Sequence, residues 1–283
     1  MRRQSYVFAG APVVTEAGEP TGTMLSARAT HVVERANVAA LCLDFDGTLS
    51  PIVDDPNQAR PLPGIVELLS PLAARFTAVA IVSGRPATYL AQHAAAAGVR
   101  YLGLYGLQEI RDGQVWVDPR LKSARPAVVA AQHDLRDSAA VRDSGAYLED
   151  KEYSIAVHTR RVPDPQRWAA PIDQAAREIA DRHDLEVVPG KMVWELRPAV
   201  PSDKGDAIRR VVTESGAQMV VVAGDDLGDI PAFNAAADLT SEGTEALKVA
   251  VRSAEAPEEL LAQADLIVEG PPGLREFLQR LLA

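Results

Sequence analysis

Apolar runs alternate with segments of helical periodicity along most of the chain. Four runs are apolar at nearly every position: 38–45, 77–85, 217–226 and 264–270. Helical spacing of apolar residues marks five further segments: 63–76, 87–98, 204–216, a stretch beginning at 231, and 271–283. Strands that are apolar on both faces and alternate with helices predict a parallel α/β sheet.

Residues 109–197 follow a different pattern. Helices are expected at 124–138 and 164–183, and strands at 146–149, 153–160, 185–188 and 192–197. The stretch VVPGKMV resembles a hairpin turn between the last two strands. Apolar and polar residues alternate in part along EDKEYSIAVHTR, so we expect its sheet to be covered on one face only. We therefore expect an α+β cap domain, 109–197, inserted into an α/β core made of 35–108 and 198–283. Residues 1–34 are rich in Gly, Pro, Thr and Ala, and are expected to form a loose, flexible extension.

Composition narrows the classes of partner. The net charge of −10 argues against nucleic acid and anionic membranes, although a locally positive pocket would still accept a small anion. No window approaches the roughly 18 apolar residues of a membrane span. Cys42 is the single cysteine and lies in an apolar run, so we expect it to pack as a small hydrophobe in a reducing compartment. These features predict a cytoplasmic protein, and a monomer is the default expectation.

The carboxyl ends of three predicted strands carry the candidate chemistry. Ligands bind at this edge of an open parallel sheet, and DFDGT, SGR and GDDLGD all stand there. Asp44 and Asp46 face the same way on an extended chain, at roughly 6–7 Å. Two carboxylates this close raise each other's pKa unless a cation intervenes. A single Asp-Gly pair would indicate only a turn, whereas two Asp-rich strand ends in one sheet favour a site.

GDDLGD adds three carboxylates, those of Asp225, Asp226 and Asp229. Oxygen ligands with no His or Cys nearby favour Mg²⁺ over Zn²⁺. A Mg²⁺ ion held by few carboxylates usually shares its coordination shell with phosphate oxygens of a substrate. The sequence therefore predicts a magnesium site that accepts a phosphorylated ligand.

Phosphate also needs hydrogen-bond donors, and the same strand ends supply them. Ser83 and the backbone around Gly84 can donate, and Thr48 lies in a turn whose amides form an anion-accepting concavity. Lys204 starts a helix, where the helix dipole adds positive potential. A lysine at a helix start is often merely solvated, but this helix leads into the GDDLGD strand, which favours a role in the site.

In their order, DFDGT, the strand-ending SGR, a Lys-Gly before a helix, and GDD with a further Asp resemble the four motifs of the haloacid dehalogenase superfamily. Residues 38–283 resemble trehalose-6-phosphate phosphatases in particular, through DFDGTLSPIVDDP, IVSGRP, LEDKEYSIAVHTR and GKMVWELRPAVPSDKG. The resemblance implies a Rossmann-type core whose cap is inserted between the second and third motifs. It also implies a Mg²⁺-dependent phosphoric monoester hydrolase of trehalose biosynthesis.

Roles of the core residues follow from the resemblance. Asp44 is expected to be the nucleophile that forms an aspartyl-phosphate, and Asp46 to be the general acid and then base. The metal is expected to take the carboxylate of Asp44 and the carbonyl of Asp46. The resemblance makes Asp225 the third protein ligand and places two more residues in or near the coordination shell, Asp226 and Asp229. The residues expected to hold the phosphoryl group are Thr48, Ser83, Gly84 and Lys204.

The cap is expected to select the leaving group. By the family pattern, the residues expected to bind the sugar are Arg85, Glu149, Lys151, His158, Arg160 and Glu195. Carboxylates and a lysine suit sugar hydroxyls as partners. EDK on its own would also suit an exposed turn, but both cap motifs match.

Five positions depart from the family pattern. Tyr105 and Gln108 stand where the family usually has His and Glu, Thr159 stands where it has Tyr, and Gly228 and Ile230 replace Thr and Glu. The phosphate machinery is complete, so these departures bear on the substrate. The alternatives are a phosphatase of another phosphorylated disaccharide or disaccharide-like metabolite, a sugar phosphomutase, and an inactive sugar-phosphate sensor.

Overall fold

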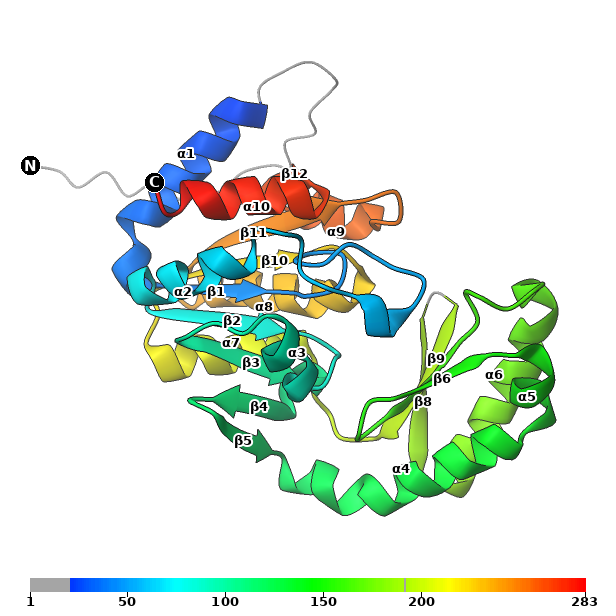
Figure 1. Ribbon diagram of the computed structural model, residues 1–283. Helices are drawn as coiled ribbons and strands as arrows, with labels where there is room; N and C mark the ends of the chain where they lie inside the picture. Colours follow the sequence, from blue (N-terminus) through cyan, green and yellow to red (C-terminus); the bar gives the residue numbers. More distant parts are fainter. Residues whose placement is uncertain (1–20, 191) are drawn as a thin grey trace, which may run out of the picture.

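The computed structural model describes residues 21–190 and 192–283, which form one large and one small β-sheet with helices around them (Figure 1). In spatial order, the strands of the large sheet are β12 (Leu266–Glu269), β11 (Glu245–Arg252), β10 (Met219–Gly224), β1 (Ala39–Leu43), β2 (Ala78–Val82), β3 (Val99–Gly103), β4 (Gln108–Arg111) and β5 (Gln114–Val117). All neighbouring pairs from β12 to β3 are parallel, and β4 and β5 are antiparallel additions. The predicted parallel α/β core is thereby confirmed.

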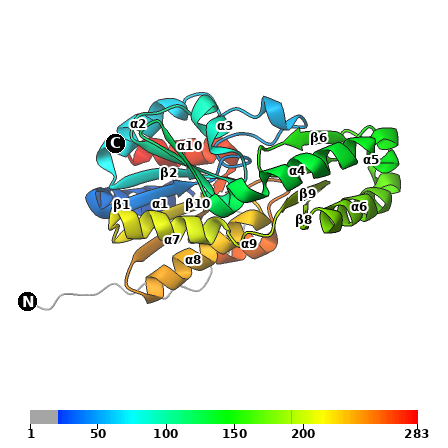
Figure 2. The same ribbon diagram turned by 90° about the horizontal axis from the view of Figure 1, so that it is seen from below.

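Helices cover both faces of the large sheet (Figure 2). One face is covered by α1 (Thr21–Glu34), α2 (Val66–Arg75), α3 (Ala87–His93) and α10 (Gly270–Arg280). The other face is covered by α7 (Lys204–Ser215), α8 (Ile230–Ser241) and α9 (Glu258–Gln263). Short 3-10 helices complete the core: η1 (Ala36–Val38), η2 (Pro56–Gln58), η3 (Leu104–Gly106) and η4 (Leu227–Asp229). The central strands are buried on both sides, which explains their unbroken apolar runs.

The order of the central strands brings the three motif-bearing ends together. Strand β1 lies between β10 and β2, parallel to both, with Leu43 beside Ala223 and Ile81. The next residues along the three strands therefore leave the sheet at the same edge. The Asp44 amide donates to the carbonyl of Ala223 at 3.0 Å, which fixes the register one step beyond the strands. The predicted meeting of the three strand ends is confirmed.

The small sheet belongs to the predicted cap. Its strands, all antiparallel, are in spatial order β6 (Tyr147–Asp150), β7 (Ile155–His158), β9 (Val193–Pro198) and β8 (Leu185–Gly190). Its helices are α4 (Pro119–Asp137), α5 (Ala139–Ser144) and α6 (Pro165–Arg182). A separate apolar cluster joins these helices to one face of the sheet, as the partial alternation of β7 predicted. The other face is turned towards the core (Figure 1).

The predicted start of the cap at residue 109 is wrong by about ten residues. Strands β4 and β5 extend the core sheet, because β4 pairs with β3 and β5 with β4. Asp112 and Gly113 join them, both with positive φ, as a tight hairpin turn requires. The chain enters the cap only at Asp118, whose side chain caps α4.

The expectation of a loose extension for residues 1–34 is also wrong over its last part. Residues 21–34 form α1, which packs beside α10. Leu25, Ala29 and Val32 recur at helical spacing and are buried in the core. The Gly- and Pro-rich composition of the preceding residues obscured this short pattern of helical spacing. The rest of the predicted extension, 1–20, lies outside the described residues.

Two further expectations concern single features. Cys42 is buried in β1, as predicted, and burial raises the pKa of its thiol to about 12. Among residues 21–190 and 192–283, no helix has the length and apolar character needed to cross a membrane.

Candidate active site

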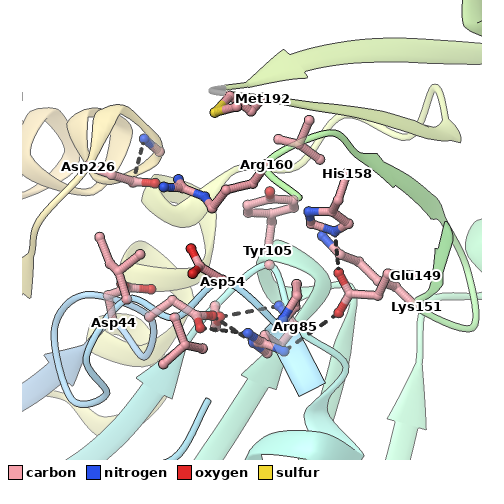
Figure 3. A pocket seen from close by; sticks show the side chains of 18 of the residues that line it. Asp44, Asp54, Arg85, Tyr105, Glu149, Lys151, His158, Arg160, Met192 and Asp226 are labelled. Atoms are coloured by element: carbon pink, nitrogen blue, oxygen red, sulfur yellow. Dashed lines mark hydrogen bonds and ion pairs between the residues drawn. The ribbon is translucent and has the colours of Figure 1, made fainter. Parts of the chain in front are cut away.

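A cavity of about 270 Å³ lies between the carboxyl edge of the large sheet and the open face of the cap sheet (Figure 3). Its floor contains Asp44, Asp46 and Lys204 from the core, and cap residues such as Lys151 and His158 form its roof. The predicted residues that line it are Asp44, Asp46, Ser83, Gly84, Arg85, Glu149, Lys151, His158, Arg160, Lys204 and Asp226. Residues far apart in sequence thus meet at one site.

At the floor, a buried lysine joins two buried aspartates. The ammonium of Lys204 donates to Oδ1 of Asp44 and to Oδ1 of Asp229, each at 2.6 Å. Burial alone would lower the pKa of Lys204, but the two carboxylates outweigh it and raise that pKa well above its usual value. Burial also raises the pKa of Asp44, and the Lys204 charge opposes that rise. Lys204 is therefore a permanent cation beside Asp44.

Asp225 and Asp229 are held by the backbone and side chains around them. The Thr48 hydroxyl donates to Oδ1 of Asp225 at 3.0 Å. Oδ2 of Asp229 accepts from the amides of Asp225 and Asp226, at 2.9 and 3.2 Å. Gly47 is required beside this cluster, because a Cβ there would lie 2.0 Å from a carboxylate oxygen of Asp225. Its φ of +77° suits glycine as well.

The cluster carries an excess of buried negative charge. Oxygens of Asp44, Asp225 and Asp229 all lie within 4.8 Å of one another. Three carboxylates and the one ammonium of Lys204 would sum to −3 + 1 = −2 with all groups ionised. Burial and the neighbouring carboxylates accordingly raise the pKa of Asp225 to about 8. A divalent cation fits both this charge and this all-oxygen set of donors.

Asp46 lies nearer the cap and pairs with Arg85. The guanidinium of Arg85 donates from Nε and Nη2 to the two oxygens of Asp46, both at 2.7 Å. Its third nitrogen, Nη1, has no hydrogen-bond partner and lies 3.6 Å from Oε1 of Glu149 in the cap. Glu149 in turn binds Nε2 of His158 at 2.9 Å (Figure 3). A continuous polar chain therefore connects the core to the cap across the cavity.

A second polar group lies within the cap. Lys151 donates to Oε2 of Glu195 at 2.9 Å, and the Ser154 hydroxyl donates to Oε1 at 2.6 Å. Burial would lower the pKa of Lys151, but Glu195 and Glu149 outweigh it and raise that pKa. Burial would raise the pKa of Glu195, but Lys151 and Ser154 lower it. Both groups therefore carry charge, which suits recognition of polar ligand groups.

Four of the predicted residues are buried without lining the cavity: Thr48, Asp225, Asp229 and Glu195. Thr48 is bonded to Asp225, and Glu195 is bonded to Lys151. Asp226 lines the rim, and its Oδ1 accepts from the amide of Gly228 at 2.8 Å. Nη2 of Arg160 lies 3.5 Å from Oε2 of Glu255 in the core. This ion pair is a further contact between cap and core.

Tyr105 is a cavity residue to which sequence reasoning gave no role. Its ring points into the cavity between core and cap (Figure 3). A Cβ on Gly84 would lie 2.7 Å from the Tyr105 hydroxyl, so glycine at that position makes room for the phenol. Burial, followed by the charge of Glu195, raises the pKa of Tyr105, which keeps its proton available for donation. Its departure from the family residue was the one signal at that position.

Comparisons with known proteins identify the family and agree with the fold. Residues 42–264 match the family described as trehalose-phosphatase, and the chain belongs to this family. A trehalose-phosphate phosphatase of Mycobacterium leprae is 32% identical over 87% of this chain and 58% of its own length. One of Mycolicibacterium paratuberculosis is 34% identical, over 86% of this chain and 61% of its own length. The chain thus spans about 60% of the length of these curated relatives.

Solved structures resemble the fold closely. A crystal structure of a trehalose-6-phosphate phosphatase related protein superposes with a TM-score of 0.69 at 25% identity, over 86% of this chain and 96% of that one. The C-terminal domain of the C. albicans trehalose-6-phosphate phosphatase gives 0.74 at 22% identity, over 91% and 96%. A haloacid dehalogenase-like hydrolase from Bacteroides thetaiotaomicron gives 0.59 at 17% identity, over 87% and 100%. The haloacid dehalogenase-like fold is thereby confirmed.

Proposed function

We propose that this chain is a Mg²⁺-dependent phosphatase that hydrolyses trehalose 6-phosphate to trehalose and phosphate through an aspartyl-phosphate. The observation that carries the proposal is the buried Asp44–Lys204–Asp229 cluster on the floor of a cavity whose roof is a polar cap. Membership of the trehalose-phosphatase family supports the choice of substrate.

Asp44 is the nucleophile in this mechanism. Its Oδ attacks phosphorus, and the bond to the sugar oxygen breaks. For Asp46 to give a proton to that oxygen, Arg85 must first release one oxygen of the Asp46 carboxyl group, so that this oxygen can carry the proton. Asp46 then takes a proton from a water molecule, which attacks phosphorus and releases Asp44 and phosphate. Lys204 offsets negative charge on Asp44 and on the phosphoryl oxygens. Because the transition state of phosphoryl transfer is loose, catalysis depends mainly on such charge neutralisation and on positioning.

Asp44 and Asp225, with the carbonyl of Asp46, would hold the metal, and Asp229 lies in the same cluster. When bound, Mg²⁺ neutralises charge on the phosphate. Ser83 and the backbone at Gly84 line the floor beside Asp44 and are the proposed phosphate donors.

Removal of the metal is expected to abolish turnover, because the excess negative charge of the cluster would repel phosphate. Assay of phosphate release after dialysis against EDTA should show loss of activity, and Mg²⁺ should restore it. Ca²⁺ is the control: because it prefers more ligands at longer distances, it should not restore activity. Full activity in EDTA would contradict the metal site.

The cap supplies the selectivity in this proposal. Glu149, Lys151 and His158 of the cap, together with Arg85 of the core, present both donors and acceptors towards the cavity, as a sugar with many hydroxyls requires. Arg160 reaches the same cavity from the cap. The test is to incubate the protein with trehalose 6-phosphate and Mg²⁺ and to identify both products. Free trehalose and phosphate in equal amounts support the proposal; an isomeric sugar phosphate with little free phosphate would indicate a mutase instead.

A further inference from the structure

Gln108 connects the core to the cap outside the catalytic cluster. It is the first residue of β4, lies opposite Gly103 of β3, and is 1% exposed. Its Oε1 accepts from the amide of Ala87, the first residue of α3, at 2.7 Å. Its Nε2 donates to Oε2 of Glu152 in the cap at 3.0 Å. One buried side chain thus has a partner in each half of the molecule.

The two contacts define the orientation of the amide. The amide of Ala87 can only donate, so it must face the oxygen of Gln108 and not the nitrogen. The NH₂ group of Gln108 is then left for the carboxylate of Glu152. Gly103 permits this arrangement, because a Cβ there would lie 2.1 Å from the Ala87 nitrogen and would prevent the approach of α3.

Both ends of this contact lie next to site residues. Ala87 follows Arg85, which binds Asp46, by two residues. Glu152 follows Lys151, which binds Glu195, and it occupies a turn with φ of +70°. The same turn is closed by bonds from the Lys151 amide to the Ser154 carbonyl and from the Tyr153 amide to the Lys151 carbonyl. Arg125 of α4 also donates to the carbonyl of Glu152.

We propose that Gln108 and Glu152 form a latch that positions the Lys151 turn over the cavity and thereby sets the affinity for the sugar. Gln108 is a positioning residue, since it touches neither the cavity nor the catalytic cluster. The latch requires a side chain at residue 108 that has an acceptor for the Ala87 amide and a donor for the Glu152 carboxylate. A glutamate at residue 108, the usual family residue, would place two carboxylates face to face, whereas glutamine satisfies both partners. This inference rests on the proposed function only for the identity of the sugar phosphate.

Gln108→Glu tests the latch, and exchange of the two side chains controls it. We expect Q108E to raise KM for trehalose 6-phosphate about tenfold and to change kcat less than about twofold. Q108E/E152Q should return KM to within about threefold of wild type, because the amide introduced at residue 152 donates to the carboxylate introduced at residue 108. E152Q alone should match wild type, because its side-chain carbonyl still accepts from Gln108. An unchanged KM in Q108E, or no recovery in the exchange variant, would overturn the proposal.

A second pair of variants covers the case in which Q108E fails to fold. E152A alters only a partly exposed cap turn, and Q108M removes the amide without adding charge. Each should raise KM, and the double variant should be no worse than the more impaired single variant, because both remove the same contact. Additive effects would contradict the latch.

Hydrolysis of p-nitrophenyl phosphate separates failure of the latch from failure of the proposed function. This small ester needs the core but not the sugar-binding cap, so Q108E should leave its kinetics unchanged. Wild-type protein that hydrolyses neither ester would refute the proposed function. In that case, amide hydrogen exchange at Lys151 and Tyr153 decides on the latch: faster exchange in Q108E supports it, and equal exchange overturns it.

Discussion

Asp44→Asn is expected to lower kcat for trehalose 6-phosphate by roughly 10⁴-fold or more, since it removes the proposed nucleophile. The neutral amide is nearly the same size, so Lys204 can still donate to residue 44 and keeps its bond to Asp229. The substitution also removes one negative charge from the buried cluster, where burial disfavours the charged form of Asp44 and raises its pKa. The folded protein should therefore be at least as stable as wild type. Steady-state phosphate release and thermal unfolding measure the two effects.

Asp54→Asn provides the matched control for this variant. Asp54 lines the same cavity, but it is exposed and forms no part of the buried cluster. Its loss should change kcat only a few-fold, by weakening the general negative potential. Equal loss of activity in both variants would indicate that charge in the cavity, and not a nucleophile at Asp44, governs turnover.

Lys204→Met is expected to have the second largest effect, and it should reduce both activity and stability. Loss of the ammonium should lower kcat by about 10²–10³-fold, as for other preorganised donors at a developing charge. It also leaves Asp44 and Asp229 buried without their cation, which costs about 3–5 kcal/mol when a buried ion pair is broken. Denaturant unfolding and phosphate release measure the two losses on the same preparation.

Lys204→Arg separates charge from geometry. It retains the positive charge, so most of the stability should return. The planar guanidinium cannot reproduce two contacts of 2.6 Å from a single nitrogen, so activity should stay low. Wild-type activity in K204R would contradict the assigned contacts, and wild-type stability in K204M would contradict the burial of the pair.

The core was predictable because its signals are local and strong. Uninterrupted apolar runs predicted β1, β2 and β10, and the rule that ligands bind at the carboxyl edge placed Asp44, Ser83 and Asp225 together. The missed elements have weaker signals. Strands β4 and β5 are short and only partly buried, and the Asp112–Gly113 turn was the one indication of a hairpin. The apolar stripe of α1 contains only a few buried residues.

Side-chain partners were harder to predict than the positions of motifs. A motif indicates that Asp46 and Arg85 lie at one edge, but not that two hydrogen bonds join them. It also does not indicate that Thr48 points to Asp225 and away from the cavity. These contacts depend on loop conformation and on the approach of the cap, which a single sequence does not encode locally. The pair of Gln108 and Glu152, 44 residues apart, is of the same kind.

The measurement that tests the central claim most directly is kcat/KM for trehalose 6-phosphate with Mg²⁺, compared with a panel of phosphorylated monosaccharides and other disaccharides. The proposed cap contacts predict that trehalose 6-phosphate exceeds every other member, by roughly tenfold or more if one or two hydrogen bonds to the second sugar ring are lost. A different sugar phosphate that is hydrolysed faster by orders of magnitude would contradict the assigned substrate.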